Sequence, residues 1–155
     1  MAEHNIDYLV ETLIEHWKKQ GLLINPAKVE DIENYQKVNG YKLPYDFKKF
    51  YTRVNGMQQF YPNEIDENGF LIYPIEGVTP AAKEIENSKM EGISRIFIFS
   101  DYMHCSWWYG CSVRDDDTYI IGIIASRNNF KPICNTLSEF LELYIADSPR
   151  LYDYS

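Results

Sequence analysis

Apolar residues recur every three or four positions near the N-terminus, the period of a helix that buries one face. The pattern predicts a first helix over residues 6–20. Its apolar stripe consists of Ile6, Leu9, Val10, Leu13, Ile14 and Trp17. We expect a second helix after Asn25-Pro26, where a capping residue precedes a first-turn proline. Its apolar face consists of Val29, Ile32, Tyr35 and Val38.

A third helical stretch, over residues 44–54, is the one around which we expect the chain to fold. Pro44 suits the first turn because a missing N–H costs nothing there, and Asn55-Gly56 can take the left-handed conformation that stops a helix. The large side chains on one face are Phe47, Phe50, Tyr51 and Val54. This helix is therefore an aromatic wedge that other elements must cover.

Beyond residue 70 the pattern indicates strands. Apolar runs at residues 70–73 and 96–99 predict two strands, the second buried on both faces. Residues 105–113 alternate, which predicts a strand with Trp108 on a small polar face. Its inward face would consist of Cys105, Trp107, Tyr109, Cys111 and Val113. Further strands are expected at residues 118–124 and 130–133, after a hairpin turn at Asp115, Asp116 and Asp117.

Two more helices complete the prediction. A short surface helix is expected over residues 80–87, and Thr136 and Glu139 form a capping box that opens a last helix. Strands that are segregated from helices indicate an α+β fold, with an antiparallel sheet of about four to five strands and helices on one side or end. A chain of 155 residues favours a single domain over residues 1–155.

The net charge of −8 disfavours direct nucleic-acid binding, which needs a basic surface. No apolar run is long enough for a membrane helix, and three cysteines without a visible signal peptide favour a reduced, cytoplasmic setting. Residues 54–82 contain no Lys or Arg but four acids: Glu64, Asp66, Glu67 and Glu76. This window either steers a basic partner or is a solvated loop, and the sequence leaves both interpretations open.

Candidate chemistry is sparse. The spacing of Cys105 and Cys111 is not that of a zinc site, so we expect no metal and no cofactor. No nucleophile or phosphate-binding motif occurs, and we expect no enzyme activity. The pair Asp101 and His104 keeps a small hydrolase as a minor alternative. Thirteen Tyr and three Trp are more informative, because both are favoured in protein–protein contacts.

The sequence resembles the SUKH superfamily, which includes fungal cell-wall-assembly (glucan synthesis) regulators and bacterial immunity proteins. The main motif runs from Leu43-Pro44 through Asp46, Phe47 and Phe50 to Asn55-Gly56. Weaker support comes from residues 29–38, 96–101 and 130–144, so the resemblance covers about residues 25 to 145. One departure is Tyr102-Met103-His104, where family members often carry a glycine. The shape of that turn is therefore open.

The resemblance implies a binding scaffold without catalysis. In bacteria such a protein would neutralise a toxin domain, often a nuclease and therefore basic, which fits the acidic chain. The alternative is a regulatory module of the cell-wall-assembly type. We expect a monomer or weak dimer that binds neither nucleic acid nor membrane directly. Acids would steer and rings would anchor the partner. The predicted partner-binding residues are Tyr61, Glu64, Asp66, Glu67, Trp108, Asp115, Asp116 and Asp117.

Overall fold

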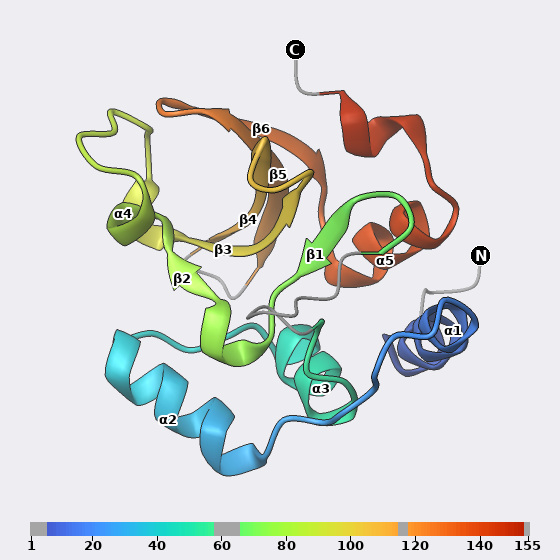
Figure 1. Cartoon of the computed structure of the whole chain (residues 1–155). Coiled ribbons are helices and arrows are strands. Elements are labelled where there is room, and N and C mark those ends of the chain that lie inside the picture. Colours follow the sequence, from blue (N-terminus) through green and yellow to red (C-terminus); the bar gives the residue numbers. More distant parts are fainter. Residues whose placement is uncertain (1–5, 58–65, 115–117, 154–155) are drawn as a thin grey trace.

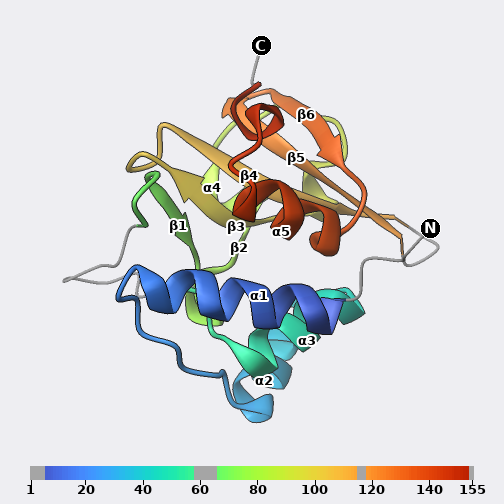
Figure 2. The same cartoon turned by 90° about the vertical axis from the view of Figure 1, so that its right-hand side faces the viewer.

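The computed structural model describes residues 6–57, 66–114 and 118–153. A curved antiparallel sheet lies above a layer of helices, as Figures 1 and 2 show. Its strands follow the order β1-β3-β4-β5-β6, and the short β2 also pairs with β3. The strands are β1 (Phe70–Ile72), β2 (Thr79–Pro80), β3 (Ile96–Tyr102), β4 (Trp107–Val113), β5 (Tyr119–Ser126) and β6 (Asn129–Cys134). This arrangement confirms the predicted α+β fold.

Four of the described α-helices lie on one face of the sheet, and a fifth, short one packs against β2 and β3. Figure 2 shows α5 between the sheet and α1, with α3 beside α1 and α2 farthest from the sheet. The α-helices are α1 (Ile6–Lys19), α2 (Val29–Asn39), α3 (Tyr45–Arg53), α4 (Ala81–Glu84) and α5 (Leu137–Ile145). Single 3₁₀ turns are η1 (Ile75–Gly77), η2 (Ile93–Arg95) and η3 (Pro149–Tyr152).

The aromatic wedge of α3 lies at the centre of the core, as predicted. Its buried members are Phe47, Phe50, Tyr51 and Val54. The Phe47 ring meets Phe97 and Phe99 of β3 edge-on, with both centroid distances at 5.2 Å. Between α1 and α5, the Trp17 side chain is fully buried and donates its indole N–H to the Tyr144 hydroxyl at 2.8 Å. These contacts join α1, α3, α5 and the sheet in one core.

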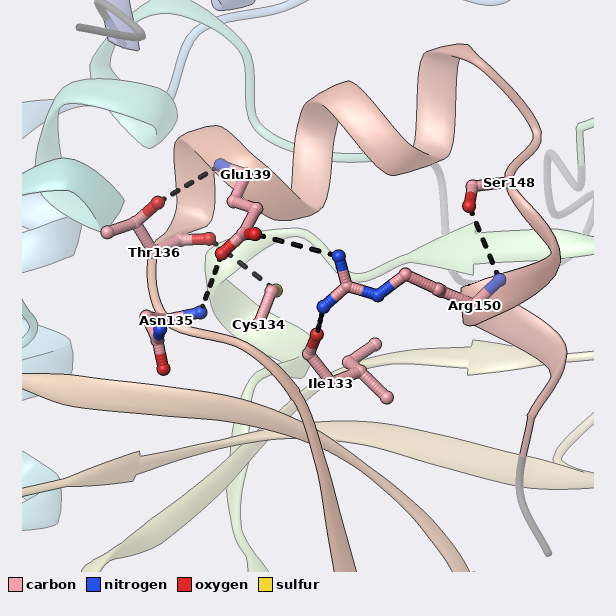
Figure 3. A network of polar contacts seen from close by, with 7 residues as sticks. All are labelled: Ile133, Cys134, Asn135, Thr136, Glu139, Ser148 and Arg150. Carbon is pink, nitrogen blue, oxygen red and sulfur yellow. Dashed lines mark hydrogen bonds and ion pairs between the residues drawn. The ribbon is translucent and has the colours of Figure 1, made fainter.

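The C-terminal segment is fastened to the end of β6 by the network in Figure 3. The Arg150 guanidinium donates to the Ile133 carbonyl and lies 3.7 Å from the Glu139 carboxylate. Glu139 accepts the Asn135 backbone N–H, while its own N–H donates to the Thr136 hydroxyl at 3.1 Å. The predicted cap at Thr136 therefore forms and also holds η3. Arg150 of η3 thereby occupies a carbonyl of the outermost strand, β6, that could otherwise pair with another chain.

The prediction for the second helix was partly wrong. Helix α2 begins at Val29, with Lys28 rather than Asn25 as its N-cap residue. Val29 and Val38 are 58% and 70% exposed, and α2 buries only Ile32 and Tyr35. The physical reason is that no element covers the outer flank of this helix among the residues described (Figure 1). A periodic apolar pattern shows which face is apolar, not whether a partner element covers it.

The turn between β3 and β4 also departs from the prediction. Cys105 is exposed and lies outside the strand, which begins at Trp107, so its placement on the inward face was wrong. Met103, His104 and Cys105 have φ of 49°, 55° and 66°. Three consecutive left-handed residues without glycine are strained, at about 1 kcal/mol or more each. Elsewhere, the predicted helix at 80–87 shortens to the single turn of α4, because β2 takes Pro80 and the backbone becomes extended at Ile85.

Candidate protein-binding surface

The first half of the main motif has a structural role. Leu43 is buried, Pro44 is the N-cap residue of α3, and the Asp46 carboxylate accepts the Tyr119 hydroxyl at 2.9 Å. That hydroxyl in turn accepts the Leu137 N–H at 2.7 Å. Because the first N–H groups of a helix have no partner inside it, Tyr119 satisfies the start of α5. The motif aspartate thus joins α3, β5 and α5 through one hydroxyl.

The second half of the motif fastens the η1 turn. Helix α3 ends before Asn55, at an extended Val54, so Asn55-Gly56 does not itself provide the helix cap. Instead, the Asn55 side-chain oxygen accepts the Ile75 N–H at 2.7 Å, and its amide nitrogen donates to the Glu76 carboxylate at 3.2 Å. Gly56 has a φ of 59°, and a Cβ there would lie 2.6 Å from the Ile72 carbonyl oxygen. Only glycine satisfies both constraints.

A groove lies between α2 and the η1 turn that Asn55 holds. Its volume is about 260 Å³. Its lining residues are Asp31, Asn34, Tyr35, Val38, Asn39, Ile75 and Glu76. We call it the acidic groove, because two carboxylates and no cation occur among these lining residues. Asn55 restrains the Glu76 carboxylate, while the largely exposed Val38 adds an apolar contact. A groove of this composition can receive the side chain of an arginine or lysine.

Five of the predicted partner-binding residues lie outside the described residues, namely Tyr61, Glu64, Asp115, Asp116 and Asp117. Asp66 is described and is only 6% exposed. Its carboxylate accepts the backbone N–H groups of Asn68 and Phe70 at 2.9 and 2.8 Å, and it is hydrogen-bonded to the Tyr144 hydroxyl. Asp66 therefore holds the turn before β1 against α5. Because its carboxylate is buried, Asp66 is not part of the proposed binding surface.

The two remaining predicted residues, Glu67 and Trp108, lie near different strands of the sheet. Glu67 is exposed in the turn before β1, and its N–H donates to the Gln20 side chain at 2.9 Å. Trp108 of β4 is half-buried against the core and pairs with Asp101 of β3 and Ile124 of β5. Strand β3 separates β1 from β4, so these residues do not form one cluster.

The Asp101–His104 hypothesis finds no geometric support. Asp101 is only 4% exposed, and its carboxylate accepts the Tyr73 hydroxyl at 2.7 Å and the Cys105 thiol at 3.3 Å. His104 is exposed in the strained turn. Burial, with the nearby Asp101, raises the pKa of the Cys105 thiol to about 11. A protonated thiol is a weak nucleophile. The Asp101 carboxylate therefore stabilises the turn between β3 and β4 through its contact with Cys105.

The part of the chain that the structure describes contains no cluster of side chains suited to a metal ion. No group of three or more His, Cys, Asp or Glu side chains in ranges 6–57, 66–114 and 118–153 is arranged to hold an ion. Cys111 and Cys134 are buried, and burial raises the pKa of both thiols. They pack as small apolar residues, in agreement with the interpretation of Cys111 from strand alternation.

A scan against protein-family models matched residues 26–143 to the SMI1 / KNR4 family (SUKH-1). The chain belongs to this family. The matched range contains the motif from Leu43 to Gly56 and runs from the segment before α2 into α5, which leaves α1 outside it. No curated protein matched the chain. Members of the SUKH family interact with other proteins as immunity or regulatory modules and are generally not catalysts. None of the described helices is long and apolar enough to cross a membrane.

Proposed function

We propose that this protein is an immunity protein that binds and neutralises a basic toxin domain of the nuclease type. Membership of a family of immunity and regulatory modules supports the proposal. The net charge of −8 favours encounter with a basic partner, because opposite charges raise the association rate. The observation on which the proposal mainly depends is the acidic groove, where carboxylates from two distant segments face one cavity.

The proposed interface is centred on the acidic groove. Asp31 and Glu76 would receive a basic side chain, and Val38 would contact the apolar part of the partner. The hydrogen bond from Asn55 holds Glu76 before the partner arrives, which lowers the ordering cost of binding. Glu67 and Trp108, together with Tyr61, Glu64, Asp115, Asp116 and Asp117, stay in the proposal as further contacts.

The test is binding to the toxin domain encoded beside this gene, measured by biolayer interferometry at 50 and 300 mM salt. We expect the association rate of the natural protein to fall at least tenfold between the two conditions. The double substitution Asp31→Asn and Glu76→Gln should weaken binding at low salt by about tenfold or more. The matched control, Glu15→Gln with Glu86→Gln, changes the charge equally at exposed positions outside the groove.

Three outcomes would contradict the proposal. An association rate that is independent of salt would exclude electrostatic steering. Equal binding by the groove variant and the control would move the interface away from Asp31 and Glu76. If the toxin domain does not bind at all and a pull-down recovers several endogenous partners, the protein is instead a regulatory module of the cell-wall-assembly type. If the toxin domain does bind, cleavage assays with it separate binding from neutralisation.

A further inference from the structure

A second cavity lies on the other side of the α2 C-terminus, against the ends of β3 and β4. Its volume is about 330 Å³. Three basic residues line it: Lys42 after α2, Arg95 at the end of η2 and Arg114 after β4. We call it the cationic pocket. It adjoins a cavity of about 550 Å³, and the two share Arg95 and Arg114 in their walls.

The charge of this pocket opposes that of the whole chain. The protein has 23 acidic and 15 basic residues, yet none of the described residues that line the pocket is acidic. Lys42 and Arg114 border the same cavity, so an anion placed there would be attracted by both.

The rest of the lining is suited to an apolar body. Tyr41 and Phe97 contribute stacked rings, with centroids 5.6 Å apart and planes inclined by 19°. The Tyr41 hydroxyl is hydrogen-bonded to the Tyr35 hydroxyl of α2, which fixes the ring in its position. Val113 adds apolar surface, and Ser94 adds a neutral hydroxyl. Ligand pockets commonly have this volume, a mostly apolar lining and a few orienting polar groups.

We propose that the cationic pocket binds a small organic anion, with a phosphate or carboxylate group toward Lys42 and Arg114 and a planar apolar body against Tyr41. Arginine pairs with such groups through two parallel hydrogen bonds, and lysine adds a point charge. This activity is separate from toxin binding, because the acidic groove and the cationic pocket share only Asn39 among their lining residues.

The test is a titration of the ¹⁵N-labelled full chain, followed by amide chemical shifts. The probes are phenyl phosphate, benzoate, inorganic phosphate and phenol. We expect one of the two organic anions to shift the amides around Ser94, Phe97 and Arg114 with a Kd at least tenfold lower than that of inorganic phosphate. Comparing phenyl phosphate with benzoate distinguishes a phosphate from a carboxylate ligand. Phenol should not saturate the site.

Two variants and their controls test the assignment. Arg114→Gln and Lys42→Gln should each raise the Kd of the better organic anion at least fivefold. The controls Arg127→Gln and Lys18→Gln remove exposed charges that do not line the pocket. Unchanged spectra outside the pocket confirm that each variant is folded, and if one variant fails to fold, the other decides. Equal affinity for inorganic phosphate, meaning an adventitious ion only, would overturn the proposal, as would equal losses in variants and controls.

Discussion

The contact between Asp46, Tyr119 and Leu137 gives a sharp test of what the family motif does. Tyr119→Phe keeps the buried ring beside Phe47 and removes only the hydroxyl. Two hydrogen bonds are lost together, the 2.9 Å bond to Asp46 and the 2.7 Å bond from the Leu137 N–H. Leu137 is buried, so its N–H is left without a partner at the start of α5.

The expected loss of stability follows from the two hydrogen bonds that the substitution removes. A buried donor that loses its partner costs about 1–3 kcal/mol, whereas the half-buried Asp46 can turn to water and adds about 1 kcal/mol or less. We therefore expect Tyr119→Phe to lower the free energy of unfolding by about 2–3 kcal/mol. For a chain of this length, about 2–4 °C of melting temperature is lost per kcal/mol, which predicts a shift of about 5–10 °C.

The assay is urea unfolding followed by tryptophan fluorescence, with Tyr8→Phe as the control. Tyr8 lies exposed on α1, so its hydroxyl should contribute less than about 0.5 kcal/mol. Asp46→Asn should cost less than Tyr119→Phe, and the two losses should not add in the double variant, because they remove the same bond. A Tyr119→Phe loss as small as that of the control would refute the assignment of this hydroxyl as the link between α3 and α5.

Three further predictions concern backbone strain, the C-terminal network and the exposed thiol. Gly56→Ala should lower the unfolding free energy by more than about 2 kcal/mol, because its Cβ would meet the Ile72 carbonyl, whereas Gly40→Ala, with open space around it, should cost only about 1 kcal/mol in the same urea assay. Arg150→Ala should speed hydrogen exchange of η3 and early α5 amides at least fivefold while leaving α1 unchanged, and equal exchange in both proteins would rule out the role drawn in Figure 3. The rate of Cys105 alkylation by iodoacetamide should keep rising up to about pH 11 and should not level off near pH 9, because the fold favours the neutral thiol. The raised pKa also stabilises the folded state. This contribution is present below the pKa of the unfolded chain and is lost as pH rises through the pKa of the folded protein.

Much of the fold could be predicted because its signals are local. The stripe of α1, the wedge of α3 and the cap at Thr136 each depend on residues within one or two turns, and the structure confirms all three. The alternation in β4 correctly placed Tyr109 and Cys111 in the core. The same alternation wrongly placed Cys105 in the strand, because strand propensity does not indicate where the preceding turn ends. That position depends on the Asp101 carboxylate, which is oriented by Tyr73 from another segment.

The candidate site was harder to predict, since its members come from distant parts of the chain. Glu76 is one acid in a window without basic residues, but nothing in the sequence pairs it with Asp31. Asp66 belongs to the same window but is buried, because its carboxylate accepts a hydrogen bond from Tyr144, which lies 78 positions away in the chain. Nothing in the sequence groups Lys42, Arg95 and Arg114, because each stands far from the other two along the chain.

By itself, the sequence determined most helices and strands, the family and the acidic balance, because hydrophobic period, capping residues and net charge depend on neighbouring positions or on simple sums. The tertiary structure alone decided that α2 leaves two valines exposed, that Asp66 is buried, and that acids line one cavity while cations line the next. The physical reason is that burial and cavity lining depend on which distant segments meet, and that is settled by packing around the aromatic wedge.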